Sequence, residues 1–218
     1  MGPLVVALVV TSRGVERRFT KIGVRDSKLL RPKRREELYG EIMKLATDVR
    51  VDRIMPQEIN EAMRNRISLN ELEAVRFARL FDQVKDDVGS FYLDSPDVIA
   101  EKFGIRVNMF SVKPTRVRGV KSKQEQALGT RIIAEHKADS KYPVVSAASI
   151  IAKVTRDREM KKIEKALGVK IGSGYPSDSY TVESVRKHMN ESKFAAHLRD
   201  HWSTMDHIRQ TSITKFFE

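Results

Sequence analysis

Continuous runs of aliphatic residues predict where the strands of this chain lie. Residues 4–10 read LVVALVV, and a run of this kind is typical of a strand buried on both faces in the middle of an α/β sheet. A polar turn follows, after which residues 16–23 can return as a second strand. Shorter apolar runs predict further strands at residues 91–93, 107–112 and 131–134.

Helical spacing of apolar residues predicts the segments between these strands. A helix should begin at Pro32, since proline suits a first helical position and apolar residues then recur three and four positions apart. Ser68 and Glu71 have the spacing of a capping box, which predicts the start of a second helix. Residues 144–167 predict a long helix that Gly168 can end. Strands that alternate with helices imply a three-layer α/β domain with a helical C-terminal region.

Composition narrows the classes of function. Forty-one Lys and Arg residues against 29 Asp and Glu residues give a net charge of +12, which favours a polyanionic partner such as nucleic acid. The 218 residues include no cysteine, which excludes disulfides, thiolate metal sites and thiol nucleophiles and is typical of an intracellular protein. The opening apolar run is far shorter than the roughly 20 residues of a membrane span. We therefore expect a cytoplasmic protein that has no membrane partner and uses carboxylates, hydroxyls, amines or histidine.

Two carboxylates follow predicted strands, at the places where open α/β sheets bind their ligands. Asp94 comes directly after the strand at 91–93, and Asp139 comes shortly after the strand at 131–134. Carboxylates that converge from two strand ends can hold a divalent cation, and Mg²⁺ prefers ligands of this kind. Each acid has an alternative interpretation, because Asp94 could cap a helix over residues 97–103 and Asp139 could be a loop acid.

Two further patterns are open to a functional interpretation. His197 and His201 are four residues apart on a predicted helix, but Leu198 occupies the position where a zinc protease motif needs its glutamate, which argues against zinc. Residues 113–123 carry five Lys and Arg residues with little apolar content. This composition is typical of a solvated loop and would also suit a loop that binds phosphates.

Five short segments occur in an order that is specific to one enzyme family. They are residues 23–35 (GVRDSKLLRPKRR), 92–98 (YLDSPDV), 136–139 (HKAD), 144–157 (VVSAASIIAKVTRD) and 172–178 (GSGYPSD). Together they resemble the successive motifs of archaeal ribonuclease HII. The resemblance runs from Gly2 to the C-terminus, with a longer basic segment at residues 113–130.

The resemblance implies an RNase H-like three-layer fold with a mixed, five-stranded central sheet. In that family four carboxylates hold two Mg²⁺ or Mn²⁺ ions, which activate a water to cut the RNA strand of RNA–DNA hybrids and duplex DNA at embedded ribonucleotides. Asp94 and Asp139 match the third and fourth of these carboxylates. Lys28 matches a lysine that binds phosphate. Tyr175 matches the tyrosine at the RNA–DNA junction, although a tyrosine alone would more often belong to a core or a turn.

One motif of the family has no counterpart in the printed sequence. The first two carboxylates of the family lie in an Asp-Glu-Ala-Gly-Arg-Gly segment shortly before the Gly-Pro-Leu-Val run, which here starts at Gly2. Met1 is then either an internal methionine of a longer protein or the start of a truncated form, and we expect the chain as printed to be inactive and less stable. A non-catalytic protein that binds hybrids or a sliding clamp is the alternative.

The last residues resemble the peptide by which replication and repair proteins dock on the sliding clamp PCNA. Gln210 is followed after two residues by Ile213, and after two more by the aromatic pair Phe216 and Phe217. A short 3₁₀ turn would bring the three apolar side chains to one side as a plug for an apolar pocket, with the glutamine hydrogen-bonded beside them. The two phenylalanines could instead fold back on their own domain.

These interpretations divide the chain into three parts. Residues 1–168 would form the RNase H-like catalytic domain without its first strand, residues 169–208 a helical C-terminal region, and residues 209–218 the clamp-binding tail. The expected partners are RNA–DNA hybrid, ribonucleotide-containing duplex DNA and PCNA. We expect the protein to be a monomer.

Overall fold

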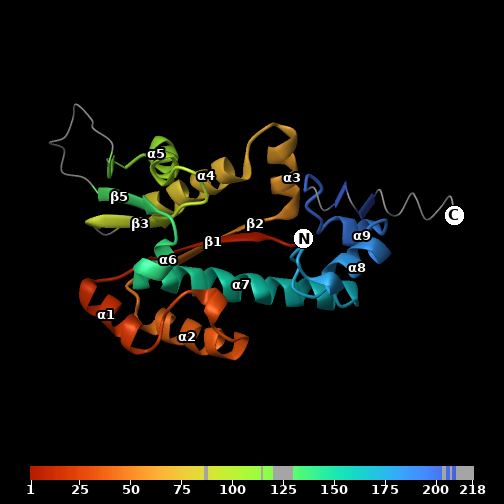
Figure 1. Ribbon diagram of the computed structural model, residues 1–218, viewed down its shortest axis with the longest axis horizontal. Helices are drawn as coiled ribbons and strands as arrows, with labels where there is room; N and C mark the ends of the chain where they lie inside the picture. The colour runs from red at the N-terminus through yellow and green to blue at the C-terminus, as the bar shows by residue number, and fades with distance from the viewer. Residues whose placement is uncertain (86–87, 114, 120–129, 203–204, 207, 210–218) are drawn as a thin grey trace. The chain divides into compact units, whose positions relative to one another are not determined.

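A computed structural model describes residues 1–85, 88–113, 115–119, 130–202, 205–206 and 208–209 (Figure 1). Its elements in chain order are β1 (Leu4–Val10), α1 (Arg13–Lys21), the 3₁₀ helix η1 (Ser27–Leu29), α2 (Pro32–Leu45), β2 (Asp48–Ile54), α3 (Pro56–Arg64), α4 (Leu69–Asp82), β3 (Ser90–Asp94), α5 (Ala100–Phe110), β4 (Thr115–Val117), β5 (Thr130–Glu135), α6 (Ala138–Lys141), α7 (Pro143–Leu167), α8 (Ser179–His188) and α9 (Ser192–Ala195).

The chain forms two compact units, which are described separately. The sheet unit comprises residues 6–52 and 70–154. The C-terminal unit comprises residues 1–5, residues 53–69 and the described residues from Thr155 onward. No helix among the described residues is long and apolar enough to cross a membrane.

The strands form two small sheets. β1 pairs with β2, while β5 lies between β3 and β4 in a parallel sheet that sets Asp94 opposite Glu135. The resemblance implied one five-stranded sheet, and in the described residues β1 and β3 are not joined by a ladder. They instead share an apolar cluster around Phe81 of α4, in which side-chain packing takes the place of backbone pairing.

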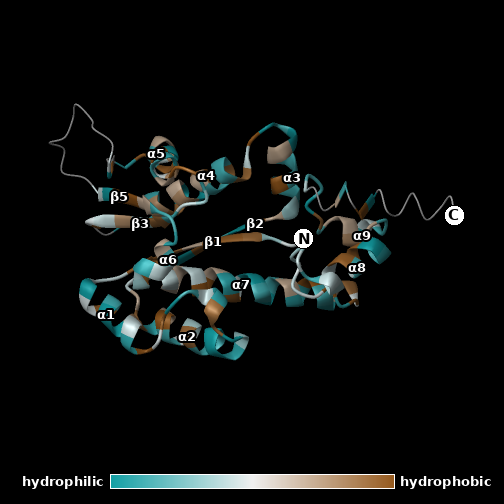
Figure 2. Cartoon of the chain, viewed as in Figure 1, coloured by the Kyte–Doolittle hydropathy of each residue, from teal (hydrophilic) through white to brown (hydrophobic). Residues whose placement is uncertain are grey.

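Helices pack on both faces of the strands in the sheet unit, as the predicted three-layer order requires. Ala7 and Val9 of β1 belong to a cluster that includes residues of α1, α2 and α7, whereas Val6 and Leu8 of the same strand pack with Phe81. Successive side chains of a strand point to opposite faces. The apolar strand β1 is therefore covered on both faces, as its continuous aliphatic run predicts (Figure 2).

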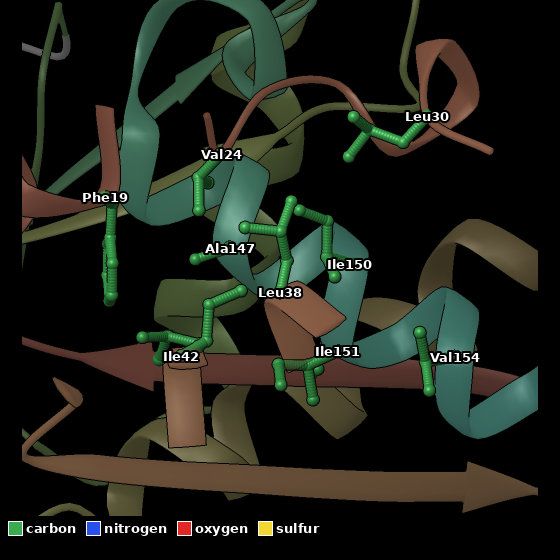
Figure 3. Close-up of a cluster of buried hydrophobic side chains, with 11 residues drawn as sticks. Phe19, Val24, Leu30, Leu38, Ile42, Ala147, Ile150, Ile151 and Val154 are labelled. Carbon is green, nitrogen blue, oxygen red and sulfur yellow. The ribbon is translucent and has the colours of Figure 1, made fainter. Parts of the chain in front are cut away.

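Side chains of α2 and α7 meet in the cluster that also contains β1. Leu38 and Ile42 of α2 are fully buried and lie close to Ile150 and Ile151 of α7 (Figure 3). Gly168, with φ of +70°, follows the last residue of α7. The predictions of α2 and α7, which the sequence analysis made from apolar spacing, are confirmed.

The segment predicted as a second strand is the helix α1. Ser12 caps this helix, since its side chain accepts a hydrogen bond from the backbone N–H of Val15 (3.4 Å). Phe19 is fully buried, and Val15 and Ile22 pack against the same cluster. The strand prediction is wrong because these three apolar residues recur at spacings of four and three, which is the period of a helix.

The strand predicted at residues 107–112 is also wrong, because Phe103 and Val107 lie one turn apart on the buried face of α5. This helix packs with α4 on β3 and β5. A Cβ atom at Gly104 would lie 3.2 Å from the Cβ of Ala134 in β5. The helix reaches the sheet this closely because Gly104 has no side chain.

The C-terminal unit has an apolar core of its own. Ile171 and Phe194 are fully buried in this core. Met160 and Ile163 of α7 and Val185 of α8 complete its centre. The helical C-terminal region that the sequence predicted therefore packs around the last turns of α7.

Candidate active site

The carboxylate of Asp94 lies at the carboxyl end of β3 and is exposed. Its Oδ1 accepts a hydrogen bond from the backbone N–H of Ala138 at the start of α6 (3.0 Å). The next residue, Ser95, donates its N–H to the carbonyl oxygen of Glu135 (3.0 Å), which continues the pairing of β3 with β5. α5 begins at Ala100 and has no side-chain cap, so Asp94 is not a helix cap.

Asp139 lies one residue beyond the N–H group that binds Asp94. Lys137 has a left-handed backbone (φ 54°, ψ 38°), which turns the chain from β5 into α6. The Asp139 side chain is buried, and burial is the main cause that raises its pKa. The negative charges of Asp94 and Asp26 raise this pKa further, whereas Lys28 lowers it. The structure therefore brings Asp94, Asp139 and Lys28 together, with Asp26 beside them.

The short helix η1 presents Lys28 to this group. Asp26 accepts a hydrogen bond from the backbone N–H of Lys28 (2.9 Å) and so caps η1. Arg35 of α2 is buried and donates to the carbonyl oxygen of Ser27 (3.2 Å). The Ser27 hydroxyl lies 2.9 Å from the hydroxyl of Ser149 in α7. Contacts from two helices thus fix the backbone that carries Lys28, while its side chain stays exposed.

Asp97 anchors the turn that follows Asp94. Its carboxylate is buried, forms an ion pair with Arg106 of α5 (2.8 Å) and accepts a hydrogen bond from the Asn70 side chain of α4 (2.7 Å). Its backbone N–H donates to the hydroxyl of Ser95 (3.2 Å). Because loss of one partner from a buried ion pair is costly, the turn and the carboxylate before it are held firmly.

Glu135 holds two cations next to the strand end that carries Asp94. Its carboxylate pairs with Arg118 (3.1 Å) and Lys141 (2.7 Å) and accepts a hydrogen bond from the hydroxyl of Tyr142 (3.0 Å). The hydrogen bond from Lys141 is the main cause that lowers the pKa of Glu135. Two positive charges against one negative charge leave this group net positive, which favours a phosphate nearby.

Tyr175 lies in a tight loop of the C-terminal unit. The carboxylate of Asp178 accepts a hydrogen bond from the backbone N–H of Ser173 (2.7 Å), and this bond is the main cause that lowers the pKa of Asp178 to about 2. Gly174 has φ of +75° and donates its N–H to the hydroxyl of Thr181 (3.0 Å). The Tyr175 side chain is 38% exposed, so it does not belong to a core.

Comparison with known proteins identifies the family. The family model of ribonuclease HII matches residues 1–205. The chain belongs to the ribonuclease HII family. The ribonuclease HII of Archaeoglobus fulgidus is 37% identical over 216 residues, which cover 99% of this chain and 94% of that protein. The ribonuclease HII of Thermococcus sibiricus is 36% identical over 211 residues, which cover 96% and 86%.

Solved ribonuclease H structures share the fold. The ribonuclease H2 of Pyrococcus horikoshii OT3 is 35% identical with a TM-score of 0.77, and the match covers 97% of this chain and 92% of that chain. The RNase HII of Archaeoglobus fulgidus, solved in complex with PCNA, is 37% identical with a TM-score of 0.79, covering 96% and 91%. These matches confirm the RNase H-like fold that the sequence motifs predicted.

The candidate site of this ribonuclease HII chain contains carboxylate oxygens, which are the kind of ligand that a divalent cation prefers. Asp94 and Asp139 are hard carboxylate donors, and a bound cation would relieve the repulsion that helps to raise the pKa of Asp139. Among the described residues, no group of three or more His, Asp or Glu side chains is placed to hold a metal ion. Asp94 and Asp139 are the two described residues that the family resemblance matches to metal-binding carboxylates.

Other predicted features of this ribonuclease HII chain have different outcomes. His197 and His201 do not share a helix, because α9 ends at Ala195, and the helix predicted for them is wrong. The four positions of the clamp motif lie outside the described residues: Gln210, Ile213, Phe216 and Phe217.

Sequence reasoning missed three residues that shape the ribonuclease HII site. Asp26 lies inside one of the recognised segments, and Asp97 lies inside another, but neither was given a role. Arg35 also belongs to a recognised segment. Asp26 acts on Asp139, which is distant in sequence, whereas Arg35 and Asp97 bind partners eight and nine residues away, and the motifs gave the residues without showing these contacts.

Proposed function

We propose that this ribonuclease HII is a metal-dependent endonuclease that cleaves the RNA strand of RNA–DNA hybrids and cleaves duplex DNA at embedded ribonucleotides. The observation that carries the proposal is the convergence of Asp94 and Asp139, whose charges are close enough to raise the pKa of Asp139. Membership of the ribonuclease HII family supports the same activity.

Asp94 and Asp139 would hold Mg²⁺ or Mn²⁺ through their carboxylate oxygens. When bound, such ions supply an activated water and stabilise the oxygen that leaves phosphorus. A solved Bst RNase HIII in complex with Mn²⁺ is 18% identical, so it supports a common fold alone. Asp97 would keep Asp94 in place during this chemistry, because it ties the turn after β3 to α4 and α5.

The remaining site residues would bind the substrate. Lys28 is exposed beside the two carboxylates and would contact a phosphate of the nucleic acid backbone. Tyr175 has an exposed ring that can stack on a sugar or base at an RNA–DNA junction. The 2′-hydroxyl is the group by which such a site distinguishes RNA from DNA.

Cleavage of a labelled RNA–DNA hybrid tests the proposed activity. The chain as printed should show no measurable cleavage, whereas a chain with Asp-Glu-Ala-Gly-Arg-Gly placed before Met1 should cut the RNA strand when Mg²⁺ or Mn²⁺ is added. In the extended chain, Asp94→Asn should lower turnover by about 100-fold or more, because it removes the charge of a metal ligand.

Glu61→Gln is the matched control for this experiment. Glu61 is an exposed acid of α3, so its substitution makes the same change of charge on a different surface. The control should keep the activity of the extended chain. Full activity in Asp94→Asn, measured beside an active control, would remove Asp94 from the catalytic site.

A non-catalytic protein that binds hybrids is the second candidate. The observation that favours it is that the described residues match only two of the family's four carboxylates, Asp94 and Asp139. An extended chain that binds labelled hybrid in a salt-dependent way, yet cuts it with neither metal, would support this candidate over the nuclease.

We also propose that residues 209–218 dock on PCNA. The spacing of Gln210, Ile213, Phe216 and Phe217 supports this proposal. The RNase HII of Archaeoglobus fulgidus, 37% identical to this chain, was solved in complex with PCNA, which supports it independently. Two adjacent aromatic side chains are typical anchors of such an interface.

Substitution of the aromatic pair tests docking on the chain as printed. Aromatic anchors commonly contribute about 2 kcal/mol or more each, so Phe216→Ala with Phe217→Ala should weaken clamp binding well over tenfold. Thr214→Ala, inside the same motif but not at an anchor position, should bind as tightly as the unsubstituted chain. Calorimetry with a synthetic peptide of residues 209–218 should show binding. If the double substitution lowers the melting temperature by several degrees and leaves clamp binding intact, the two phenylalanines belong to the protein's own core.

A further inference from the structure

The guanidinium group of Arg156 in α7 lies against the ring of Tyr175. Its central carbon is 3.9 Å from the ring centroid, which is the distance of a stacked cation–π contact. The Arg156 side chain is almost fully buried, with 6% exposure, whereas Tyr175 is 38% exposed. One side of the phenol ring is therefore covered by a buried cation while much of the residue remains open to solvent.

Both ends of the guanidinium are tied to backbone carbonyl oxygens. Nη1 donates to the carbonyl oxygen of Ser173 (2.9 Å), two residues before Tyr175. Nη2 donates weakly to the carbonyl oxygen of Met1 (3.5 Å). These two bonds fix the plane of the guanidinium, and the plane in turn fixes the orientation in which the ring can stack on it.

The burial of Arg156 is costly, which argues that the contact has a purpose beyond filling space. Burial is the main cause that lowers its pKa, and its hydrogen bonds in the described chain go to carbonyl oxygens. An apolar side chain of similar length would fill the same volume at a lower cost of desolvation. What such a side chain cannot do is stack as a planar cation while it also holds the loop backbone.

Other residues hold the loop itself, which separates the loop backbone from the ring. Asp178 and Thr181 bind the backbone N–H groups of Ser173 and Gly174. A Cβ atom at Gly174 would lie 3.0 Å from Nη2 of Arg156, so the absence of a side chain at Gly174 leaves room for the guanidinium. The loop thus has anchors of its own, and Arg156 adds a contact to the ring beside its bond to the carbonyl oxygen of Ser173.

We infer that Arg156 is a positioning residue that sets the orientation of the Tyr175 ring for stacking on the nucleotide at an RNA–DNA junction. The inference rests on the proposed role of Tyr175 as a substrate contact. Arg156 would then act on the selection of single ribonucleotides through Tyr175 and would not take part in metal binding or in the displacement at phosphorus. A loss of the guanidinium should leave the loop in place and free the ring.

Chemical modification of Tyr175 tests the contact on the chain as printed, without any need for activity. Nitration by tetranitromethane can be followed at each tyrosine by peptide mass spectrometry. Arg156→Lys keeps the positive charge but loses the planar group that stacks on the ring. Arg156→Met keeps a long side chain but loses both the charge and the planar group. In both variants the nitration rate of Tyr175 should rise by about threefold or more relative to that of the exposed Tyr180, because the covered face is opened. Arg158→Lys, an exposed position of the same helix, is the control and should leave the ratio unchanged.

Turnover in the extended chain tests the consequence for the substrate. Arg156→Met should lower kcat/KM on a duplex with a single ribonucleotide by about tenfold, and on a continuous hybrid by clearly less. In a chain that already carries Tyr175→Ala, Arg156→Met should lower kcat/KM by less than about a further twofold, because the two residues act through one contact. If Arg156 had only a structural role, Arg156→Met would lower kcat/KM equally on both substrates. Its effect would then multiply with that of Tyr175→Ala.

The two measurements separate this inference from the proposed function. An unchanged nitration ratio in both Arg156 variants overturns the positioning role, whatever the activity of the extended chain. If the nitration ratio rises but the extended chain cuts neither substrate, the proposed nuclease function fails while the arrangement of Arg156 and Tyr175 stands.

Discussion

The carboxylate of Asp139 is buried beside Asp94 and Asp26, and burial together with these two charges raises its pKa. In the unfolded chain the same carboxyl group ionises near its ordinary value. Between that value and the raised pKa of the folded state, the folded protein retains the proton more strongly, so its stability falls as the pH rises. Above the folded pKa the whole cost is present, and a bound cation is what would offset it.

Asp139→Asn should therefore raise the melting temperature of the metal-free chain near neutral pH while it removes cleavage by the extended chain. The neutral amide has no charge to desolvate and is not repelled by Asp94 or Asp26. Thermal melts in the presence of a chelator, from about pH 4 to about pH 8, should also show a shallower loss of stability with rising pH in the variant. A variant that melts well below the unsubstituted chain at neutral pH would mean that the carboxylate stabilises the fold.

At the scale of secondary structure, the sequence correctly predicted the helices that have strong start signals. Two short helices were instead predicted as strands. α2, α4 and α7 have proline, capping or long apolar periodicity, and all three are confirmed. α1 and α5 were taken for strands although apolar residues recur in both with the spacing of a helix. β2 and α3 were not predicted at all, although Val49 and Val51 of β2 alternate with charged residues.

Ion pairs on the other face of β2 explain why the missed strand is so polar. Arg50 pairs with Asp48 (2.7 Å), and Asp52 pairs with Arg76 of α4 (3.3 Å). The charged side chains are thus paired while Val49 packs on the core cluster. A search for alternation with a period of two, rather than for continuous apolar runs, would have found this strand.

A matched pair of glycine substitutions tests the packing of α5 against β5. Gly40 in α2 has open space where a Cβ atom would lie, so Gly40→Ala should stabilise the protein by about 0.5–1 kcal/mol through the better helix propensity of alanine. At Gly104 the new methyl group would meet Ala134 at 3.2 Å, and the overpacking should destabilise the protein by about 1 kcal/mol. Urea unfolding of both variants measures the difference. An equal gain in stability from both substitutions would show that α5 can move away from the sheet at little cost.

At the scale of the whole molecule, the sequence predicted that the two carboxylates at the strand ends lie close together. Asp94 ends β3 and Asp139 follows β5, and because these strands are parallel neighbours, the two acids converge as the topology requires. The stack of Arg156 on Tyr175 could not be predicted, because α7 and the loop after it turn back on each other through contacts that no spacing rule describes. The clamp motif stays a prediction, since its positions lie outside the described residues.

The binding of Mn²⁺ to the extended chain tests most directly the claim that Asp94 and Asp139 form a metal site. Electron paramagnetic resonance of free Mn²⁺ gives the affinity without any cleavage. We expect Asp94→Asn and Asp139→Asn each to weaken binding by about tenfold or more, because each removes a ligand charge, while Glu61→Gln binds like the unsubstituted chain. Equal Mn²⁺ affinity in all four proteins would contradict the account.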